Sequence, residues 1–413
     1  MIGAARAVEL LSRRELSAEA LLRDCLARIE AREPTVQAWE ALDAESALRE
    51  ARRIDALRER PPLCGLPVGI KDLIDTADLP TGYGSPLYRG HRPSADAACV
   101  RALRHSGAVI VGKTVSTEFA VYSPGKTRNP RDPLRTPGGS SSGSAAAVAD
   151  GMVPLALGTQ TAASVIRPAS FCGVIGWKPG YGILSLEGVH PLAPSLDTLG
   201  FFVRALEDVP VAMAALGAPL RRHEPKREPV VFGLCRTEAW DRAEPSTRSA
   251  IEAVAARLDA REVKLGPAFD GLVEAQLAIM GAEAAVSLGR EDPGGLSARL
   301  REFLEAGNAV PAERLRAAHA QAGRCRLELD AIFASSGVDA LFTPAAAGEA
   351  PHGLAATGDP IFSRIWTLLG APCASLPVLQ GPAGLPLGLQ LVGARGGDES
   401  LLASCAAVMR CAP

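Results

Sequence analysis

The sequence predicts an α/β protein built on a mixed β-sheet, and three observations lead to this fold class. Short β-like runs separated by Gly, Ser and Pro clusters fill the middle third of the 413-residue chain. Further runs typical of strands alternate with helical stretches in the second half. The composition is 47% hydrophobic and 22% charged, which is ordinary for a globular protein and leaves ample material for a large core.

The first elements follow from local patterns. Ser17 is placed to cap a helix that has apolar residues on one face and charges on the other. Residues 1–60 are therefore expected to form a helical cover. Apolar runs of strand length come next, and they predict strands at 66–70, 108–111, 153–157, 229–235, 339–343, 374–379 and 387–393.

The second half also contains helical patterns and one charged run. Helices are predicted at 245–260 and 311–333. The run RRHEPKRE at 221–228 is typical of an exposed connection rather than of a binding patch. No internal repeat of fixed period is visible, which argues against a solenoid.

Bulk properties exclude several classes of function. A net charge of −2 gives no reason to expect a nucleic acid or an anionic membrane as partner. The N-terminus is charged and no apolar run reaches the roughly 18 residues that a membrane span needs, so a cytoplasmic protein with a small substrate is expected. The nine cysteines and six histidines show no ligand spacing, so reduced, mostly buried thiols and neither metal nor cofactor are expected.

One motif match fails in its context. Residues 107–114, GAVIVGKT, satisfy the phosphate-loop pattern G-x-x-x-x-G-K-[ST]. A phosphate loop follows a strand, whereas a helix-like segment precedes Gly107 and the four middle residues form an apolar β run. Nucleotide binding is not expected, and Lys113 is interpreted as a residue just past the end of a strand.

The stretch TPGGSSSGSAAA at 136–147 allows three interpretations. A flexible linker is disfavoured because the stretch continues directly into helix-compatible and then strand-like sequence. A helix N-terminus fits better, since Gly and Ser supply caps and good helix formers follow Ser144. The third interpretation is catalytic: a tight glycine turn would hold a serine hydroxyl at the start of the helix.

Candidate partners for such a serine lie on both sides. Downstream, Ser164 follows a turn of small residues whose backbone N–H groups could converge on a developing oxyanion. Upstream, Lys71 ends an apolar strand, where burial would favour the neutral amine, a base. The structural alternatives are that Ser164 is a turn serine and that Lys71 pairs with Asp72 or Asp75.

Three segments together resemble the amidase signature family: Lys71 in GIKD, Ser140 in GGSSSGS and Ser164 in GTQTAASVIRPASFCGVIGWKP. Similar segments at 357–378 and 385–395 extend the resemblance over most of the chain. The resemblance implies a single domain, 1–413, with helices on both faces of a large mixed sheet. Its expected parts are a helical cover at 1–60, a signature core at 61–205, a variable substrate-pocket region at 206–350 and a sheet-completing segment at 351–413.

The resemblance also implies a Ser-Ser-Lys triad and an acyl-enzyme. In this mechanism Ser164 attacks the amide carbonyl, Ser140 relays its proton and neutral Lys71 accepts it. The Gly139–Ser140 peptide is expected to be cis, as in the family. The backbone N–H of Ser164 is expected to form the oxyanion hole together with those of Thr161, Ala162 and Ala163.

The pattern Gly-Thr-Gln-Thr-x-x-Ser-Val-Ile-Arg most resembles the malonamidase branch, in which the arginine three residues after the nucleophile binds the free carboxylate of the substrate. Arg167 has this position. The resemblance thus implies a cofactor-free amidohydrolase for a small amide that carries a carboxylate, with a homodimer as the expected assembly. A structural ion pair is the alternative role for Arg167.

Two other functions stay open. One is a glutamine-dependent amidotransferase A-type subunit with obligate partner chains, although segment 117–132 lacks the longer insertion associated with that subunit. The other is a catalytically weak binding protein. It is suggested by Ala162 and Ala163, where the family usually has glycine, because a side chain at positive φ would cost about 1 kcal/mol.

Overall fold

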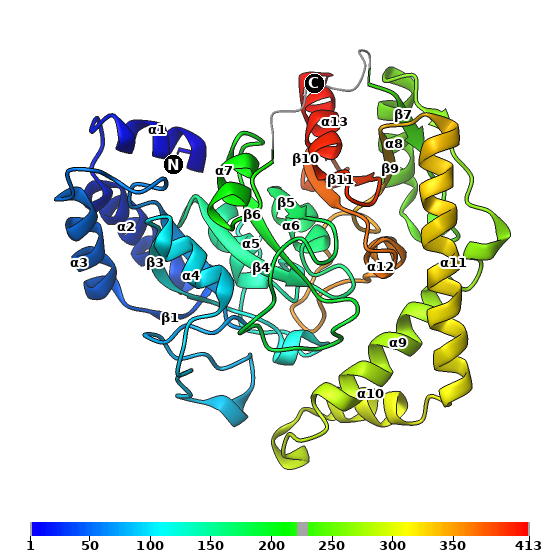
Figure 1. Cartoon of the computed structure of the whole chain (residues 1–413), viewed down its shortest axis with the longest axis horizontal. Coiled ribbons are helices and arrows are strands. Elements are labelled where there is room, and N and C mark those ends of the chain that lie inside the picture. Colours follow the sequence, from blue (N-terminus) through cyan, green and yellow to red (C-terminus); the bar gives the residue numbers. More distant parts are fainter. Residues whose placement is uncertain (1, 221–229, 412–413) are drawn as a thin grey trace.

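A mixed β-sheet of eleven strands forms the centre of the described part of the chain, residues 2–220 and 230–411, in a computed structural model (Figure 1). Neighbouring strands are parallel in the pairs β3/β2, β2/β4, β9/β7 and β7/β8 and antiparallel elsewhere. Across the sheet the order is β1 (Trp39–Leu42), β3 (Val109–Thr114), β2 (Pro67–Lys71), β4 (Leu155–Gln160), β6 (Thr198–Val203), β5 (Ile175–Lys178), β10 (Cys373–Gln380), β11 (Pro386–Gly393), β9 (Ala340–Pro344), β7 (Phe232–Leu234) and β8 (Arg261–Glu262).

Helices cover both faces of this sheet. Every residue of β2, β3, β4, β5 and β6 is buried, which requires packed layers on either side. The described residues form the helices α1 (Ala4–Ser12), α2 (Ala18–Val36), α3 (Ala44–Asp55), α4 (Ala98–His105), α5 (Ser142–Ala149), α6 (Ile166–Cys172), α7 (Asp208–Ala215), α8 (Pro245–Arg257), α9 (Leu272–Ser287), α10 (Ala298–Asn308), α11 (Ala312–Ser336), α12 (Ile361–Leu368) and α13 (Asp398–Cys411).

Figure 1 shows how the two ends of the molecule differ. Helices α1 to α3 lie at the end of the sheet that contains β1 and β3, while α9, α10 and α11 pack against one another at the opposite end. Between them, α5 packs on β2 and β4, and α6 packs on β5, β10 and β11. The serine-rich and Arg167 segments therefore lie on the central strands.

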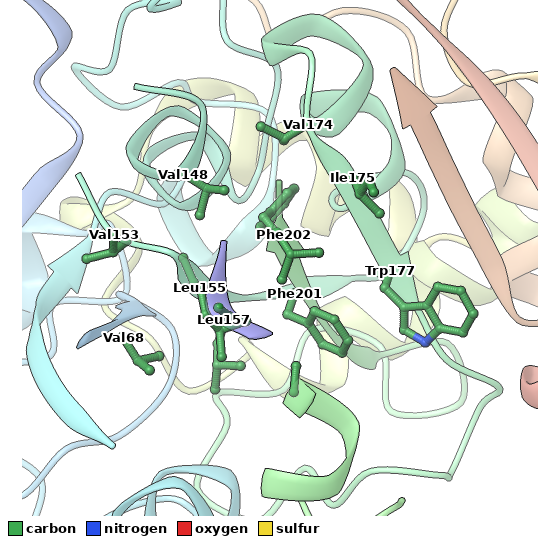
Figure 2. Close-up of a cluster of buried hydrophobic side chains, with 14 of the residues drawn as sticks. Val68, Val148, Val153, Leu155, Leu157, Val174, Ile175, Trp177, Phe201 and Phe202 are labelled. Carbon is green, nitrogen blue, oxygen red and sulfur yellow. The ribbon is translucent and has the colours of Figure 1, made fainter. Parts of the chain in front are cut away.

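A cluster of buried apolar side chains lies beside α5 and the central strands. Figure 2 shows Val148 of α5 above Leu155 of β4, with Trp177 of β5 and Phe201 and Phe202 of β6 beside them. All five side chains are fully buried. Large apolar groups on adjacent strands fix the register of the strands that carry the polar site residues.

The predicted α/β class with a mixed sheet is confirmed. The seven predicted strands correspond to β2, β3, β4, β7, β9, β10 and β11, and the two predicted helices correspond to α8 and α11. Ser17 caps α2 as expected, accepting a 3.0 Å hydrogen bond from Ala20 N. Residues 1–60 are not wholly helical, because they also supply β1 at the edge of the sheet.

The prediction for Lys113 is wrong. Lys113 does not lie past the end of a strand but inside β3, where it pairs with Ala41 of β1. The apolar run ends at Val111, yet β3 continues to Thr114 because residues 112–114 pair with β1 on one side and with β2 on the other. The fully buried Lys113 ammonium donates to the carbonyl of Ile74 and to the hydroxyl of Thr81.

Three further expectations concern the cysteines, the charged run and membrane spans. All nine cysteines lie in the described residues as free thiols, and eight are buried. The charged run at 221–228 lies outside the described residues. Within 2–220 and 230–411, no helix has both the length and the apolar character needed to span a membrane.

Close packing of α5 leads to a prediction about stability. A Cβ at Gly143 would lie 2.2 Å from the Ala38 carbonyl oxygen and 2.4 Å from Val115 N, both backbone atoms that cannot move aside. We expect Gly143→Ala to lower the free energy of unfolding by about 3 kcal/mol or more, measured by denaturant titration. The matched control is Gly323→Ala on α11, where a Cβ meets nothing within 4 Å. That change should stabilise the protein by about 0.5–1 kcal/mol, and equal destabilisation by both changes would contradict the packing argument.

Candidate active site

Lys71 is the last residue of β2 and is fully buried. Its ammonium nitrogen Nζ lies 2.7 Å from Ser140 Oγ and 2.7 Å from Thr159 Oγ1. Burial lowers the pKa of Lys71 to about 7, because a charged amine loses its hydration there, while the Asp197 carboxylate acts in the opposite direction. Lys71 is thus poised to be a neutral amine near neutral pH.

The alternative ion pairs of Lys71 are absent among the described residues. Asp72 instead accepts a 3.0 Å hydrogen bond from Gly82 N, and Asp75 accepts one of 2.7 Å from the Tyr83 hydroxyl. The lysine is therefore directed toward the serine-rich loop and away from its acidic neighbours in the sequence.

The serine-rich segment forms the loop before α5 and the first turn of that helix. The Gly139–Ser140 peptide is cis, as expected. The following serines anchor the segment: Ser141 Oγ donates to the Thr159 carbonyl (3.2 Å), and Ser144 Oγ donates to the Leu157 carbonyl (2.7 Å). The Ser140 hydroxyl, in contrast, accepts a hydrogen bond from Lys71 and makes none with the described backbone.

Ser164 lies in a turn between β4 and α6, and it is 8% exposed. In the described structure the backbone N–H groups of residues 161–164 have no hydrogen-bond partner. The carbonyl groups of this turn are engaged, since the Thr161 oxygen accepts from Gln276 Nε2 (3.2 Å) and the Ala162 oxygen accepts from Thr367 Oγ1 (2.8 Å). Consecutive free donors beside a serine hydroxyl are suited to stabilising an oxyanion.

Neither alanine in this turn has a positive φ. The conformational cost considered for Ala162 and Ala163 therefore does not arise, and the reason to expect a weakened oxyanion hole falls away. Gln160 also supports the turn, because its side-chain oxygen accepts from Val165 N (2.9 Å) and Ile166 N (3.1 Å) at the start of α6.

Asp197 connects the turn with the lysine. Its carboxylate accepts from the Thr161 hydroxyl (2.5 Å) and from Leu192 N (2.8 Å) and Ala193 N (3.0 Å). Burial raises the pKa of Asp197 to about 6 despite these bonds. Asp197 is ionised above that pH, and its charge then favours the protonated form of Lys71.

Arg167 lies on the first turn of α6 and is 5% exposed. Its Nη2 donates to the Gly139 carbonyl (2.7 Å) and to Thr357 Oγ1 (3.0 Å), while its Nε and Nη1 are buried without a partner. It forms no ion pair with any described residue. Burial, with a further contribution from Arg364, lowers the pKa of Arg167 to about 9.

One pocket brings these groups together. Ser140, Ser164, Arg167 and the turn at 161–163 all line it, and its volume is about 500 Å³ including the mouth that opens to solvent, which limits it to a small ligand or part of one. No described lining residue is acidic. From the region 206–350, expected to shape the pocket, Met280 is the single described residue in the lining, so that expectation stays a prediction.

Besides Gln160 and Asp197, four more supporting residues were not predicted from the sequence. The Thr159 hydroxyl accepts a hydrogen bond from Lys71, because β2 and β4 are parallel neighbours and bring the two residues together. The sequence pattern did not reveal this pairing. Gln276, Thr367 and Arg364 come from α9 and α12, more than 100 residues after the turn they support. Arg364 and Thr367 lie within segment 357–378, which resembles the amidase signature family, and this resemblance was the one sequence signal that could have indicated their roles.

The fold and this site define an enzyme that acts on amide C–N bonds, and comparisons with known proteins agree. A family model described as Amidase matches residues 20–402, so the chain belongs to the amidase family. A solved structure described as an amidase superimposes with a TM-score of 0.91 at 32% identity, covering 100% of both chains.

The comparisons also give a more specific relative. The A-type subunit of the glutamyl-tRNA(Gln) amidotransferase from Symbiobacterium thermophilum is 33% identical over 97% of this chain and 95% of its own length. Another similar structure, with a TM-score of 0.90, 29% identity and coverage of 99% of this chain and 98% of its own, belongs to a vestigial protein complex linked to the origins of an s-triazine catabolic enzyme. The first of these two relatives corresponds to the amidotransferase alternative better than to the malonamidase-type expectation.

Proposed function

We propose that this protein hydrolyses a small amide that carries a carboxylate, through Ser164, Ser140 and Lys71. The observation that carries the proposal is the contact between the buried Lys71 amine and the Ser140 hydroxyl, in a pocket that also holds Ser164 beside unpartnered backbone N–H groups. A base, a relay and an oxyanion site are thereby available within one small volume.

The proposed reaction has two halves. Ser164 Oγ attacks the carbonyl carbon, its proton passes to Ser140 Oγ, and the proton of Ser140 passes to the lone pair of neutral Lys71. The negative oxygen of the tetrahedral intermediate accepts hydrogen bonds from the N–H groups of the turn. The C–N bond then breaks, and the leaving amine takes the proton back along the same relay. Water repeats the attack on the acyl-enzyme, which releases the acid and restores Ser164.

Charge in the pocket supports a substrate with a carboxylate. Arg167 lines the pocket, two of its buried guanidinium nitrogens have no partner, and no described acidic residue lines the same space. A buried, unpaired charge is costly, so an anionic ligand would supply the missing partner. A simple acid monoamide such as malonamate provides it.

Replacing Arg167 tests the substrate class. We expect Arg167→Ala to raise KM for malonamate by about 10- to 100-fold, because a charge-assisted pair is lost, and to change KM for the neutral isostere malonamide much less. Steady-state kinetics on both substrates measures this. Equal losses on both would make Arg167 a structural residue.

An amidotransferase A-type subunit is the second candidate, and the named relatives favour it over the first. Glutamine is also an amide with a carboxylate, but it carries an ammonium group for which the described lining offers no acidic partner. The same assay with glutamine separates the two candidates. Higher kcat/KM for glutamine, appearing only with added partner chains, would support the amidotransferase and contradict the first proposal. Homodimer formation and a cytoplasmic location remain predictions that accompany the amidohydrolase proposal.

A further inference from the structure

Arg364 is a second buried cation in the same pocket. It lies on α12, is 6% exposed and lines the pocket together with Arg167 of α6. The two arginines come from helices almost 200 residues apart, yet their charges interact, because Arg364 contributes to the lowered pKa of Arg167. The fold therefore places two like charges beside one small cavity.

No described carboxylate neutralises Arg364. Its Nη1 donates to Gln276 Oε1 at 2.5 Å, its guanidinium also interacts with the Tyr122 hydroxyl, and it forms no ion pair within the described ranges. Asp359 attracts both arginines electrostatically, but its side chain is engaged elsewhere: Oδ2 accepts from Arg242 (2.9 Å) and Oδ1 from Ile361 N (3.0 Å). Two desolvated cations are left facing a pocket without an acidic wall.

The Arg364 guanidinium, held by neutral groups, is suited to binding an anionic ligand. Gln276 and Tyr122 position Arg364 with neutral groups, so no described carboxylate is in direct contact with it. A guanidinium has five N–H donors to share among its partners. A residue that served only packing would be satisfied by an apolar side chain of similar length at lower electrostatic cost.

We propose that Arg364 is a second specificity-determining arginine, which binds the carboxylate of the substrate together with Arg167. This inference rests on the proposed function and deepens it: the preferred amides have an acid part short enough for its carboxylate to reach both arginines while its amide carbon lies at Ser164. Monoamides of short dicarboxylic acids belong to this class.

The hydrogen bonds of Arg364 also connect the anion site with the oxyanion turn. Arg364 holds the Gln276 oxygen, and Gln276 Nε2 donates to the Thr161 carbonyl. A carboxylate that fixes Arg364 would thereby fix the Thr161 carbonyl, in the turn with the unpartnered N–H groups. Loss of Arg364 is expected to lower kcat for malonamate as well as to raise its KM.

Two variants at this position test the proposal. We expect Arg364→Gln to lower kcat/KM for malonamate about 10- to 100-fold more than for neutral malonamide, and Arg364→Lys, which keeps the charge, to recover part of the discrimination. Arg326→Gln is the control, since this half-buried arginine donates to the Leu368 carbonyl at the end of α12 and does not line the pocket. Equal losses on both substrates in the Gln and Lys variants would overturn the proposal.

Direct binding separates this inference from the proposed function. Calorimetry of malonate with a Ser164→Ala protein reports the anion site without any turnover, and adding Arg364→Gln should weaken malonate about 10- to 100-fold. Unchanged malonate affinity overturns the role of Arg364 even if hydrolysis is observed. Malonate binding that depends on Arg364, in a protein that fails to hydrolyse any amide, would sustain the anion site and reject the proposed reaction.

Discussion

Ser164→Ala is expected to abolish amide hydrolysis, with kcat falling by roughly 10⁴-fold or more. The change removes the hydroxyl that forms the covalent bond with the acyl group, and neither the lysine nor the oxyanion donors can replace it. Because Ser164 accounts for one small side chain at the pocket wall, the folded structure should be preserved. Ammonia release from malonamate, measured over hours, gives the residual rate.

Covalent labelling provides an independent measurement of the same role. A fluorophosphonate should label the native protein in a 1:1 ratio at Ser164 and leave Ser164→Ala unlabelled. Ser170→Ala is the matched control, since this buried serine lies on α6, accepts a 2.8 Å hydrogen bond from Gly388 N and does not line the pocket. Retained turnover in Ser164→Ala, or equal labelling of both variants, would show that another residue is the nucleophile.

Lys71→Met is expected to reduce kcat by about 10²- to 10⁴-fold, the usual contribution of a general base. Methionine keeps much of the length and apolar volume of the side chain, so the loss reports the amine rather than a cavity. In the native protein the pKa of about 7 sets the acidic limb of the rate profile. Below it Lys71 is protonated and cannot accept the proton of Ser140, so kcat/KM should fall as pH decreases and reach a plateau above about pH 7.

Asp197→Asn provides the matched test of this assignment. The Asp197 charge favours protonated Lys71, so its removal should lower the pKa of Lys71 and move the acidic limb to lower pH. An asparagine can keep the contacts with Thr161 and the two backbone N–H groups, because the Thr161 hydroxyl can accept as well as donate. A limb that stays in place, or that moves to higher pH, would contradict Lys71 as the titrating base.

Much of the site could be predicted because its reacting groups lie in short segments with strong local character. Lys71 ends an apolar run, Ser140 precedes a helix start and Ser164 follows a turn of small residues, and all three meet at one pocket or contact one another. The buried strands were visible for the same reason, since uninterrupted apolar runs are typical of strands covered on both faces.

The groups that hold the site could not be found in this way. The contact of Gln276 with Thr161 and that of Thr367 with Ala162 join segments with no shared local pattern, so only the folded topology places them together. The error at Lys113 has a similar origin. Its strand is extended by pairing with β2 and with β1, and β1 has only four residues, too few for a strand to be predicted from their pattern.

The bond between Gln160 and Thr367 joins residues 207 positions apart, and the turn that presents Ser164 depends on both. This has a consequence for synthesis on the ribosome. A growing chain acquires Ser164 about 200 residues before Thr367, the residue that clamps the turn. At about 5–20 residues per second, the interval is roughly 10–40 s. During that time the nascent chain carries Lys71, Ser140 and Ser164 without the contacts from Thr367 that hold the turn beside Ser164.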